Sequence, residues 1–126
     1  IKAWTFRNCA SLVELRIPGS VTSIDSEAFY GCSSLVCTTP TSLHHGFSGC
    51  TSMSTFELPK TMTRVPDWLF VGCKSLRFVV MPSYYTWIGK RAFDECRSLQ
   101  WIGNPQGLLS KSLSLIKYEA FRNSGL

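Results

Sequence analysis

The sequence contains no apolar run approaching 18 residues, so it provides no membrane-spanning helix. It also has no block of five or six like charges, because its thirteen Lys and Arg residues are scattered over 126 positions. The net charge of +5 is not accompanied by any nucleic-acid-reading motif. The mild basicity therefore favours an acidic partner or an anionic surface only weakly, and we predict no nucleic-acid partner.

Catalytic patterns are missing as well. The sequence has no nucleophile elbow, no phosphate-cradling glycine loop and no paired-carboxylate pattern, and its eight acidic residues are thinly spread. We therefore predict that the chain is not an enzyme and carries no cofactor. The absence of an Asn-x-Ser/Thr sequon argues slightly against a glycosylated surface protein.

What is present is a repeat, marked by phenylalanines in steps of 23, 18, 23, 23 and 28 residues: Phe6, Phe29, Phe47, Phe70, Phe93 and Phe121. A cysteine follows each of the first five by three residues: Cys9, Cys32, Cys50, Cys73 and Cys96. Three residues further on come Leu12, Leu35, Met53, Leu76 and Leu99, each after a serine. A shared register of this length indicates a stacked repeat array.

The spacing within one unit predicts its shape. Leu12, Leu15 and Ile17 follow an L-x-x-L-x-L spacing, with Leu15 and Ile17 facing inward from a short strand that Pro18 ends. A second inward-facing stretch follows, at Val21 and Ile24, Met62 and Val65, and Tyr85 and Ile88. We then expect a short helical turn, capped by residues such as Ser26 or Asp67. Stacked units would align their strands in one parallel sheet and close a continuous core.

The segments FYGCSSL (29–35) and FVGCKSL (70–76), with IPGSVTSI (17–24) and EAF (27–29), resemble the BspA-like class of leucine-rich repeats over the whole chain. The resemblance implies a right-handed, curved α/β solenoid with one short strand per repeat, short helical turns and a second extended stretch opposite. Members of that class are mostly bacterial and protist surface or secreted proteins that bind proteins or host matrix. The class has no shared active site. The chain departs from it where the second repeat lacks five residues, which should alter the local curvature. Five extra residues around Asn104–Ser112 should loop out on the convex side.

The repeat register predicts that residues 1–126 form a single solenoid of about five repeats. Ile1 falls in mid-repeat, and residues 121–126 begin a sixth unit. Each end would bare several apolar side chains, so we expect further repeats or a docked partner to cover at least one end.

The cysteines in register should point into the core as reduced thiols. Stacked turns about 4.8 Å apart would permit disulfides by distance, but parallel in-register side chains rarely reach the required dihedral. Cys37 lies outside the register, at a position expected to face solvent, and is the thiol we expect to react most readily.

His44 and His45, near Cys37 and Cys50, are the only histidines. A zinc site needs three or four converging ligands at recognised spacing, whereas adjacent histidines usually point different ways and Cys50 belongs to the core register. A surface turn is the favoured interpretation, and we predict no metal site.

Two surfaces are candidates for contact with a partner. Lys74 and Arg97 share one repeat position and Arg77 is nearby, so a basic edge could meet an acidic partner, although a solvated face is the favoured interpretation. On the outward side of the predicted strands, Phe78, Val80 and Trp101 lie where the inward pattern does not demand apolar residues. Either a protein partner or another segment of the same polypeptide would cover them. Trp4 and Trp68 share a further repeat position, expected on the outer surface.

The sequence thus predicts a non-catalytic protein-interaction module that binds through its strand face. The alternative is a structural subunit packed into a larger assembly through its ends and edges.

Overall fold

The computed structural model describes residues 1–15, 25, 27–37, 46–58, 60, 62–104, 106 and 108–126, the side chains of residues 36 and 37 excepted. Several predicted features lie outside the described residues: Ile17, Pro18, Val21, Ile24, Ser26, His44 and His45.

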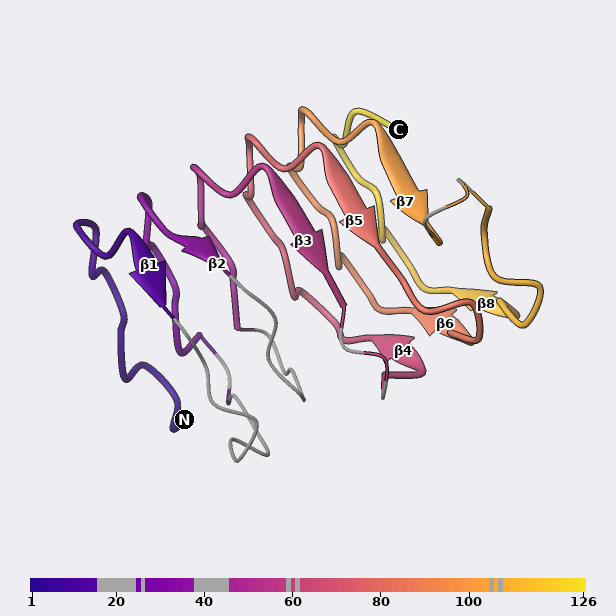
Figure 1. Cartoon of the computed structure of the whole chain (residues 1–126), viewed down its shortest axis with the longest axis horizontal. Coiled ribbons are helices and arrows are strands. Elements are labelled where there is room, and N and C mark those ends of the chain that lie inside the picture. Colours follow the sequence, from indigo (N-terminus) through magenta and orange to yellow (C-terminus); the bar gives the residue numbers. More distant parts are fainter. Residues whose placement is uncertain are drawn as a thin grey trace.

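Short parallel strands define the architecture. They are β1 (Glu14–Leu15), β2 (Val36–Cys37), β3 (Thr55–Glu57), β4 (Arg64–Val65), β5 (Phe78–Val80), β6 (Trp87–Ile88), β7 (Trp101–Gly103) and β8 (Leu115–Ile116). They pair in the orders β1-β2, β3-β5-β7 and β4-β6-β8. In Figure 1, β1, β2, β3, β5 and β7 follow one another in a row, and β4, β6 and β8 lie across the coil from β3, β5 and β7. Each turn of the chain thus contributes to the strand row, and the later turns add a second extended stretch. This is the predicted solenoid.

The turn around each phenylalanine differs from the expected helical turn, since the described residues contain no helix. Residues two places before the phenylalanine have positive φ: Trp4, Glu27, Trp68, Arg91 and Glu119. So do residues two places after it: Asn8, Gly31, Gly49, Gly72, Glu95 and Asn123. Left-handed residues on both sides interrupt any helical run. Hydrogen-bonded turns take its place, such as the bond from the Cys73 N–H to the Phe70 carbonyl (3.1 Å).

Hydrogen bonds between neighbouring turns account for this conformation. The N–H groups of Phe70 and Gly72 donate to the carbonyls of Ala92 and Asp94 in the following turn, at 2.9 and 2.8 Å. A helix would spend these donors within its own turn, whereas the solenoid uses them to join one turn to the next. Asp67, expected to cap a helix, instead accepts the backbone N–H of Lys90 at 2.8 Å across turns.

A column of phenylalanine rings runs along the core. Successive rings from Phe6 to Phe121 stack nearly parallel, with centroids 5.2, 5.5, 6.3, 5.4 and 5.3 Å apart. Phe56 of β3 packs against this column, 5.1 Å from Phe47 and 5.0 Å from Phe70. The leucine register is buried beside it at Leu35, Met53, Leu76 and Leu99. The phenylalanine and leucine positions predicted to face the core are thus buried from Phe29 to Leu99, while Phe6, Leu12 and Phe121 are half-buried.

The cysteine register forms a second column, of reduced thiols. Cys32, Cys50, Cys73 and Cys96 are fully buried, and each Sγ donates to the carbonyl of the phenylalanine one turn earlier, at 3.0, 3.4, 3.1 and 3.0 Å. Burial raises the pKa of the Cys96 thiol to about 12. The prediction is confirmed for these four, whereas Cys9, at the same repeat position, is exposed. The side chain of Cys37 is not among the described ones.

The second extended stretch also agrees with its predicted inward register. Val65, Tyr85 and Ile88 are buried, and Met62 is half-buried. Glu14 and Cys37 each stand eight residues after a phenylalanine, so the repeat register would pair them. In the structure, β1 and β2 pair Glu14 with Val36 instead. Among the described strands, no ladder joins β2 to β3, and this interruption falls at the shortened second repeat.

Candidate functional site

Phe78, Val80 and Trp101 lie on the outward side of the central three-stranded sheet. β5 and β7 run in register, with Phe78 opposite Trp101 and Val80 opposite Gly103. The residues between them, Val79 and Ile102, point into the core and are 0% and 8% exposed. Phe78 is 36% exposed, and Val80 and Trp101 are half-buried. We call Phe78, Val80 and Trp101 the strand-face patch.

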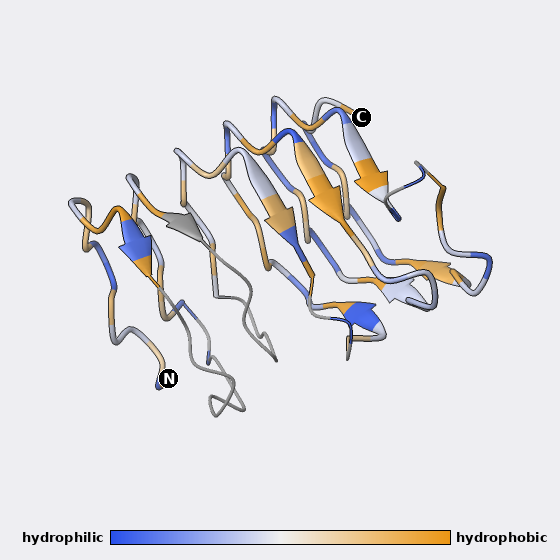
Figure 2. Ribbon diagram, viewed as in Figure 1, coloured by the Kyte–Doolittle hydropathy of each residue, from blue (hydrophilic) through white to orange (hydrophobic). Residues whose placement is uncertain are grey.

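The apolar character of this face is local. Figure 2 shows β5 coloured as hydrophobic along its length, whereas β1 begins with a hydrophilic residue. On the neighbouring strand β3, the outward positions opposite Phe78 and Val80 are the exposed, polar Thr55 and Glu57. The patch therefore has a polar border on that side.

A cavity of about 210 Å³ opens beside Val80. Leu58, Met81, Pro82 and Tyr84 line it together with Val80, and Glu57, Lys60 and Ser83 contribute its polar atoms. The Tyr84 hydroxyl donates to the Lys60 carbonyl, so this hydrogen bond joins two residues that line the cavity. Sequence reasoning missed this cavity. Since Val80 belongs to both features, the patch and the cavity form one continuous surface.

The predicted basic edge is not a row of three comparable cations. The Arg77 guanidinium lies over the Phe78 ring at 5.1 Å and donates to the Gln100 side-chain carbonyl at 3.3 Å. Arg97 pairs instead with Glu95 at 2.7 Å, while Lys74 is exposed. The structure thus brings Arg77 to the strand-face patch and compensates the charge of Arg97.

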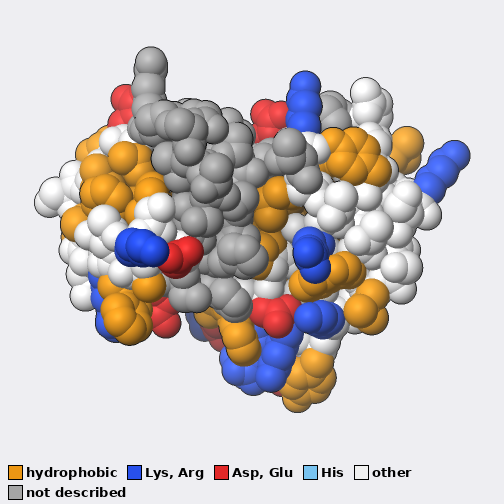
Figure 3. Space-filling model, turned by 90° about the horizontal axis from the view of Figure 1, so that it is seen from below, with side chains coloured by type: hydrophobic (Ala, Val, Ile, Leu, Met, Phe, Trp, Pro, Cys, Tyr) orange, Lys and Arg blue, Asp and Glu red, His pale blue; other side chains and the backbone are white. Residues whose placement is uncertain are grey.

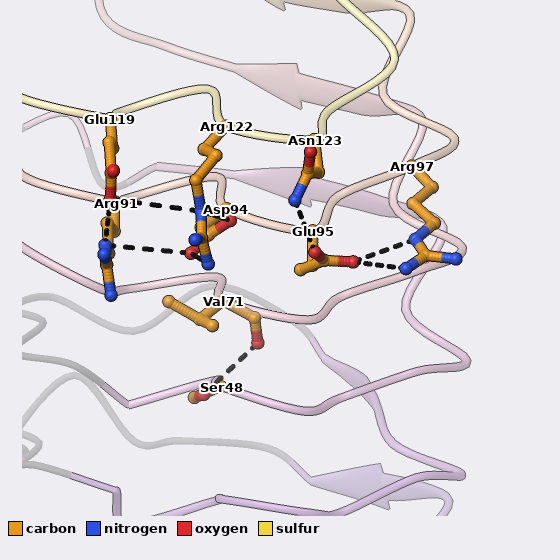
Figure 4. A network of polar contacts seen from close by, with 9 residues as sticks. All are labelled: Ser48, Val71, Arg91, Asp94, Glu95, Arg97, Glu119, Arg122 and Asn123. Atoms are coloured by element: carbon orange, nitrogen blue, oxygen red, sulfur yellow. Dashed lines mark hydrogen bonds and ion pairs between the residues drawn. The ribbon is translucent and has the colours of Figure 1, made fainter.

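A polar network joins the last two turns (Figure 4). Arg122 holds the buried Asp94 with two hydrogen bonds of 2.9 and 2.8 Å, and Arg91 pairs with Glu119 beside it. Glu95 accepts from Asn123 at 2.7 Å as well as from Arg97. Because every member has a partner in the neighbouring turn or in its own turn, we assign this network to the joining of turns rather than to a site.

Hydrogen bonds and charges in this network shift the pKa values of its members. Hydrogen bonds from Arg97 and Asn123 hold the pKa of Glu95 below its usual range. Hydrogen bonds from Tyr118 and Arg91 do the same for the pKa of Glu119. The Asp94 carboxylate raises the pKa of Arg122.

Among the described residues, no group of three or more His, Cys, Asp or Glu side chains lies close enough together to hold a metal ion. No described helix is long and apolar enough to cross a membrane.

A family model described as the BspA type leucine rich repeat region matches residues 1–45 and 43–126, in six copies. A comparison with curated proteins finds no significant match.

Two solved structures resemble the chain. A leucine rich cell surface protein from Faecalibacterium prausnitzii A2-165 is 27% identical with a TM-score of 0.66, over 93% of this chain and 35% of that one. The Leucine Rich Repeat protein of T. pallidum is 21% identical with a TM-score of 0.75, over 92% of this chain and 65% of that one. The chain therefore spans about a third of the first protein and under two thirds of the second, and the second likeness supports the fold alone.

Proposed function

Because this chain belongs to the BspA-type leucine-rich repeat family, we propose that it is a non-catalytic module that binds a protein partner through its strand face. The contact is made by Phe78, Val80 and Trp101, and the cavity beside Val80 receives an apolar side chain of the partner.

One observation carries this proposal: three partly exposed apolar side chains stand together where the core does not need them. Val79, Met81 and Ile102 already close the interior beneath the patch. Aromatic anchors with a polar border are typical of the residues that dominate protein interfaces. Thr55 and Glu57 supply such a border on β3. The patch is therefore explained by contact with a partner better than by folding.

The cavity strengthens the argument by offering a recess next to the patch. It is lined mainly by apolar side chains, of which Leu58 and Met81 are almost completely buried. A partner side chain that enters it would exchange water for the surfaces of Leu58, Val80 and Met81, and burying one large apolar side chain contributes about 1.5–3 kcal/mol.

The test is to capture partners with the wild-type protein, identify them, and measure the affinity of the purified partner for variants. Changing Phe78→Ser and Trp101→Ser together should lower affinity at least about 30-fold, because truncation of an aromatic anchor costs about 2 kcal/mol or more. Tyr30→Ser is the matched control, since Tyr30 is 38% exposed and lies in the turn beside Phe29, away from the strands.

Circular dichroism must show that the double variant keeps the wild-type fold. If it does not, Phe78→Lys replaces it, because the alkyl stem of lysine preserves packing while its charge opposes an apolar partner. Unchanged affinity in a folded variant would refute the strand-face proposal. Contact through the ends and edges, as in a structural subunit of a larger assembly, would then be the better explanation.

A further inference from the structure

A second surface lies on the sheet formed by β4, β6 and β8. Its outward register column is Arg64, Trp87 and Leu115, while Val65 and Ile88 beside them are buried. In Figure 3, Lys and Arg side chains are interspersed with hydrophobic ones on the side where these strands lie. Some charged and aromatic residues of this surface lie in the strands and others in the segments that follow them. We call them together the aromatic–cation face: Arg64, Trp68, Trp87, Lys90, Lys117 and Tyr118.

Each cation of this face lies against at least one aromatic ring. The Arg64 guanidinium is 5.7 Å and the Lys117 Nζ 4.2 Å from the centre of the Trp87 ring. The Lys90 Nζ lies 5.6 Å from the ring centre of Trp68 and 5.9 Å from that of Tyr118. Contacts of this kind attract the cation to the ring and restrict a long, flexible side chain. These side chains therefore lose less conformational entropy when a ligand binds them than ordinary surface lysines would.

The charge of the face is not balanced. Among the described residues, neither Arg64 nor Lys90 has a carboxylate within ion-pair distance. Lys117 is paired, with Asp67 at 3.2 Å. One of the three cations is thus paired with a carboxylate, and the face has a surplus of positive charge on three successive turns.

Asp67 shows how this face binds a carboxylate. Its Oδ1 accepts both the Lys117 ammonium at 3.2 Å and the Lys90 backbone N–H at 2.8 Å. Arg64 and Lys90 offer the same chemistry without such a partner. Because a cation lies over one face of each ring, that face is less accessible for the base stacking that a single-stranded nucleic acid would need.

We propose that the aromatic–cation face binds an extended acidic segment of a protein. Successive turns of the solenoid are about 4.8 Å apart, and alternate side chains of an extended peptide are about 7 Å apart, so flexible glutamates at alternate positions can reach cations on successive turns. The exposed parts of Trp68 and Tyr118, which are 40% and 68% exposed, offer apolar area to the side chains that flank those carboxylates. A peptide supplies both kinds of group.

This surface is separate from the strand-face patch, because β4, β6 and β8 form a different sheet from β3, β5 and β7 (Figure 1). The two surfaces can therefore be occupied at the same time and tested independently.

The experiment measures binding of a labelled peptide of alternating Glu and Ser by fluorescence anisotropy at low ionic strength, with a Gln–Ser peptide as the neutral control. We expect Arg64→Gln and Lys90→Gln each to weaken binding about two- to fivefold, and the double variant about four- to twenty-fivefold. Arg7→Gln is the matched control, since Arg7 is also exposed and lies 5.3 Å above an aromatic ring, that of Tyr30. It should leave the affinity unchanged.

Binding of the Glu–Ser peptide should survive Phe78→Ser, so failure of the strand-face proposal would not affect this result. Equal binding of the Gln–Ser peptide, or equal weakening by Arg7→Gln and Arg64→Gln, would overturn the proposal, because it would show that this face has no special role. A sulfated polysaccharide is tested in parallel. If it binds at Arg64 and Lys90 and the acidic peptide does not, the proposal is overturned in favour of a glycan ligand.

Discussion

Truncation of Phe70 and of Phe78 should have very different effects on stability, although the two phenylalanines lie in the same repeat. Phe70 is 0% exposed and its ring centre lies 5.4, 6.3 and 5.0 Å from those of Phe93, Phe47 and Phe56. Phe70→Ala should cost about 5 kcal/mol, at the upper end for a buried phenylalanine, because three aromatic contacts are lost and a cavity remains.

Phe78→Ala should cost much less. Phe78 keeps 36% of its surface in water, so the substitution gives up less burial and leaves no closed cavity. Loss of the partial burial and of the Arg77 contact should amount to about 1–2 kcal/mol.

The measurement is urea-induced unfolding followed by far-UV circular dichroism. At an m-value of about 2 kcal/mol per molar, the midpoint should fall by roughly 2.5 M for Phe70→Ala and by about 0.5–1 M for Phe78→Ala. Since solenoid repeats can unfold in stages, the m-values must match the wild type before midpoints are compared. An equal loss of stability in both variants would refute the outward placement of Phe78, because a register slip of one residue moves a whole strand's side chains to the other face.

Two other predictions follow from the titrating groups. Brief alkylation of the native protein at pH 8, followed by peptide mapping, should label the exposed Cys9 and leave Cys96 unlabelled until the protein unfolds. The reason is that burial raises the pKa of the Cys96 thiol to about 12. Early labelling of Cys96 would contradict the buried thiol column. The folded-state pKa values of Glu95 and Glu119 are lowered, so their contribution to stability is fully present above the unfolded carboxyl pKa of about 4.3 and is lost as the pH falls through the folded values. The urea midpoint should therefore drop in this acid range, and the double variant Glu95→Gln, Glu119→Gln should flatten the drop; an unchanged acid profile in that variant would assign the loss to other groups.

The stack of turns was predictable from the sequence because a 23-residue unit cannot bury its apolar face alone. Phenylalanine, cysteine and leucine recur at fixed positions, and only stacking places each set in one column. The outward position of Phe78 and Trp101 followed from the same register, since alternate residues of a strand point to opposite faces. Cys9 shares its repeat position with four buried cysteines and is nevertheless exposed, so the period by itself does not fix burial.

The turn conformation was not predictable in the same way. Glu27 and Arg91 adopt positive φ although neither is a glycine, and local propensity favours the helical region for both. Hydrogen bonds to the neighbouring turn, such as that from the Arg91 N–H to the Tyr118 carbonyl at 3.2 Å, stabilise the left-handed conformation. These bonds exist only after the turns have stacked, so no single repeat carries their signal.

The sequence by itself determined which side chains share a column, because a fixed period places equivalent residues at equivalent points of every turn. The tertiary structure alone decided what the polar and charged side chains contact. Lys74 and Arg97 occupy one repeat position, yet Lys74 is exposed whereas Arg97 pairs with Glu95. Arg77, nearby in the sequence, lies over the Phe78 ring. A buried apolar side chain has one favourable direction, into the core, whereas a long charged side chain chooses among all groups within its reach. Those groups, like the walls of the cavity beside Val80, come from different turns and meet only in the folded chain.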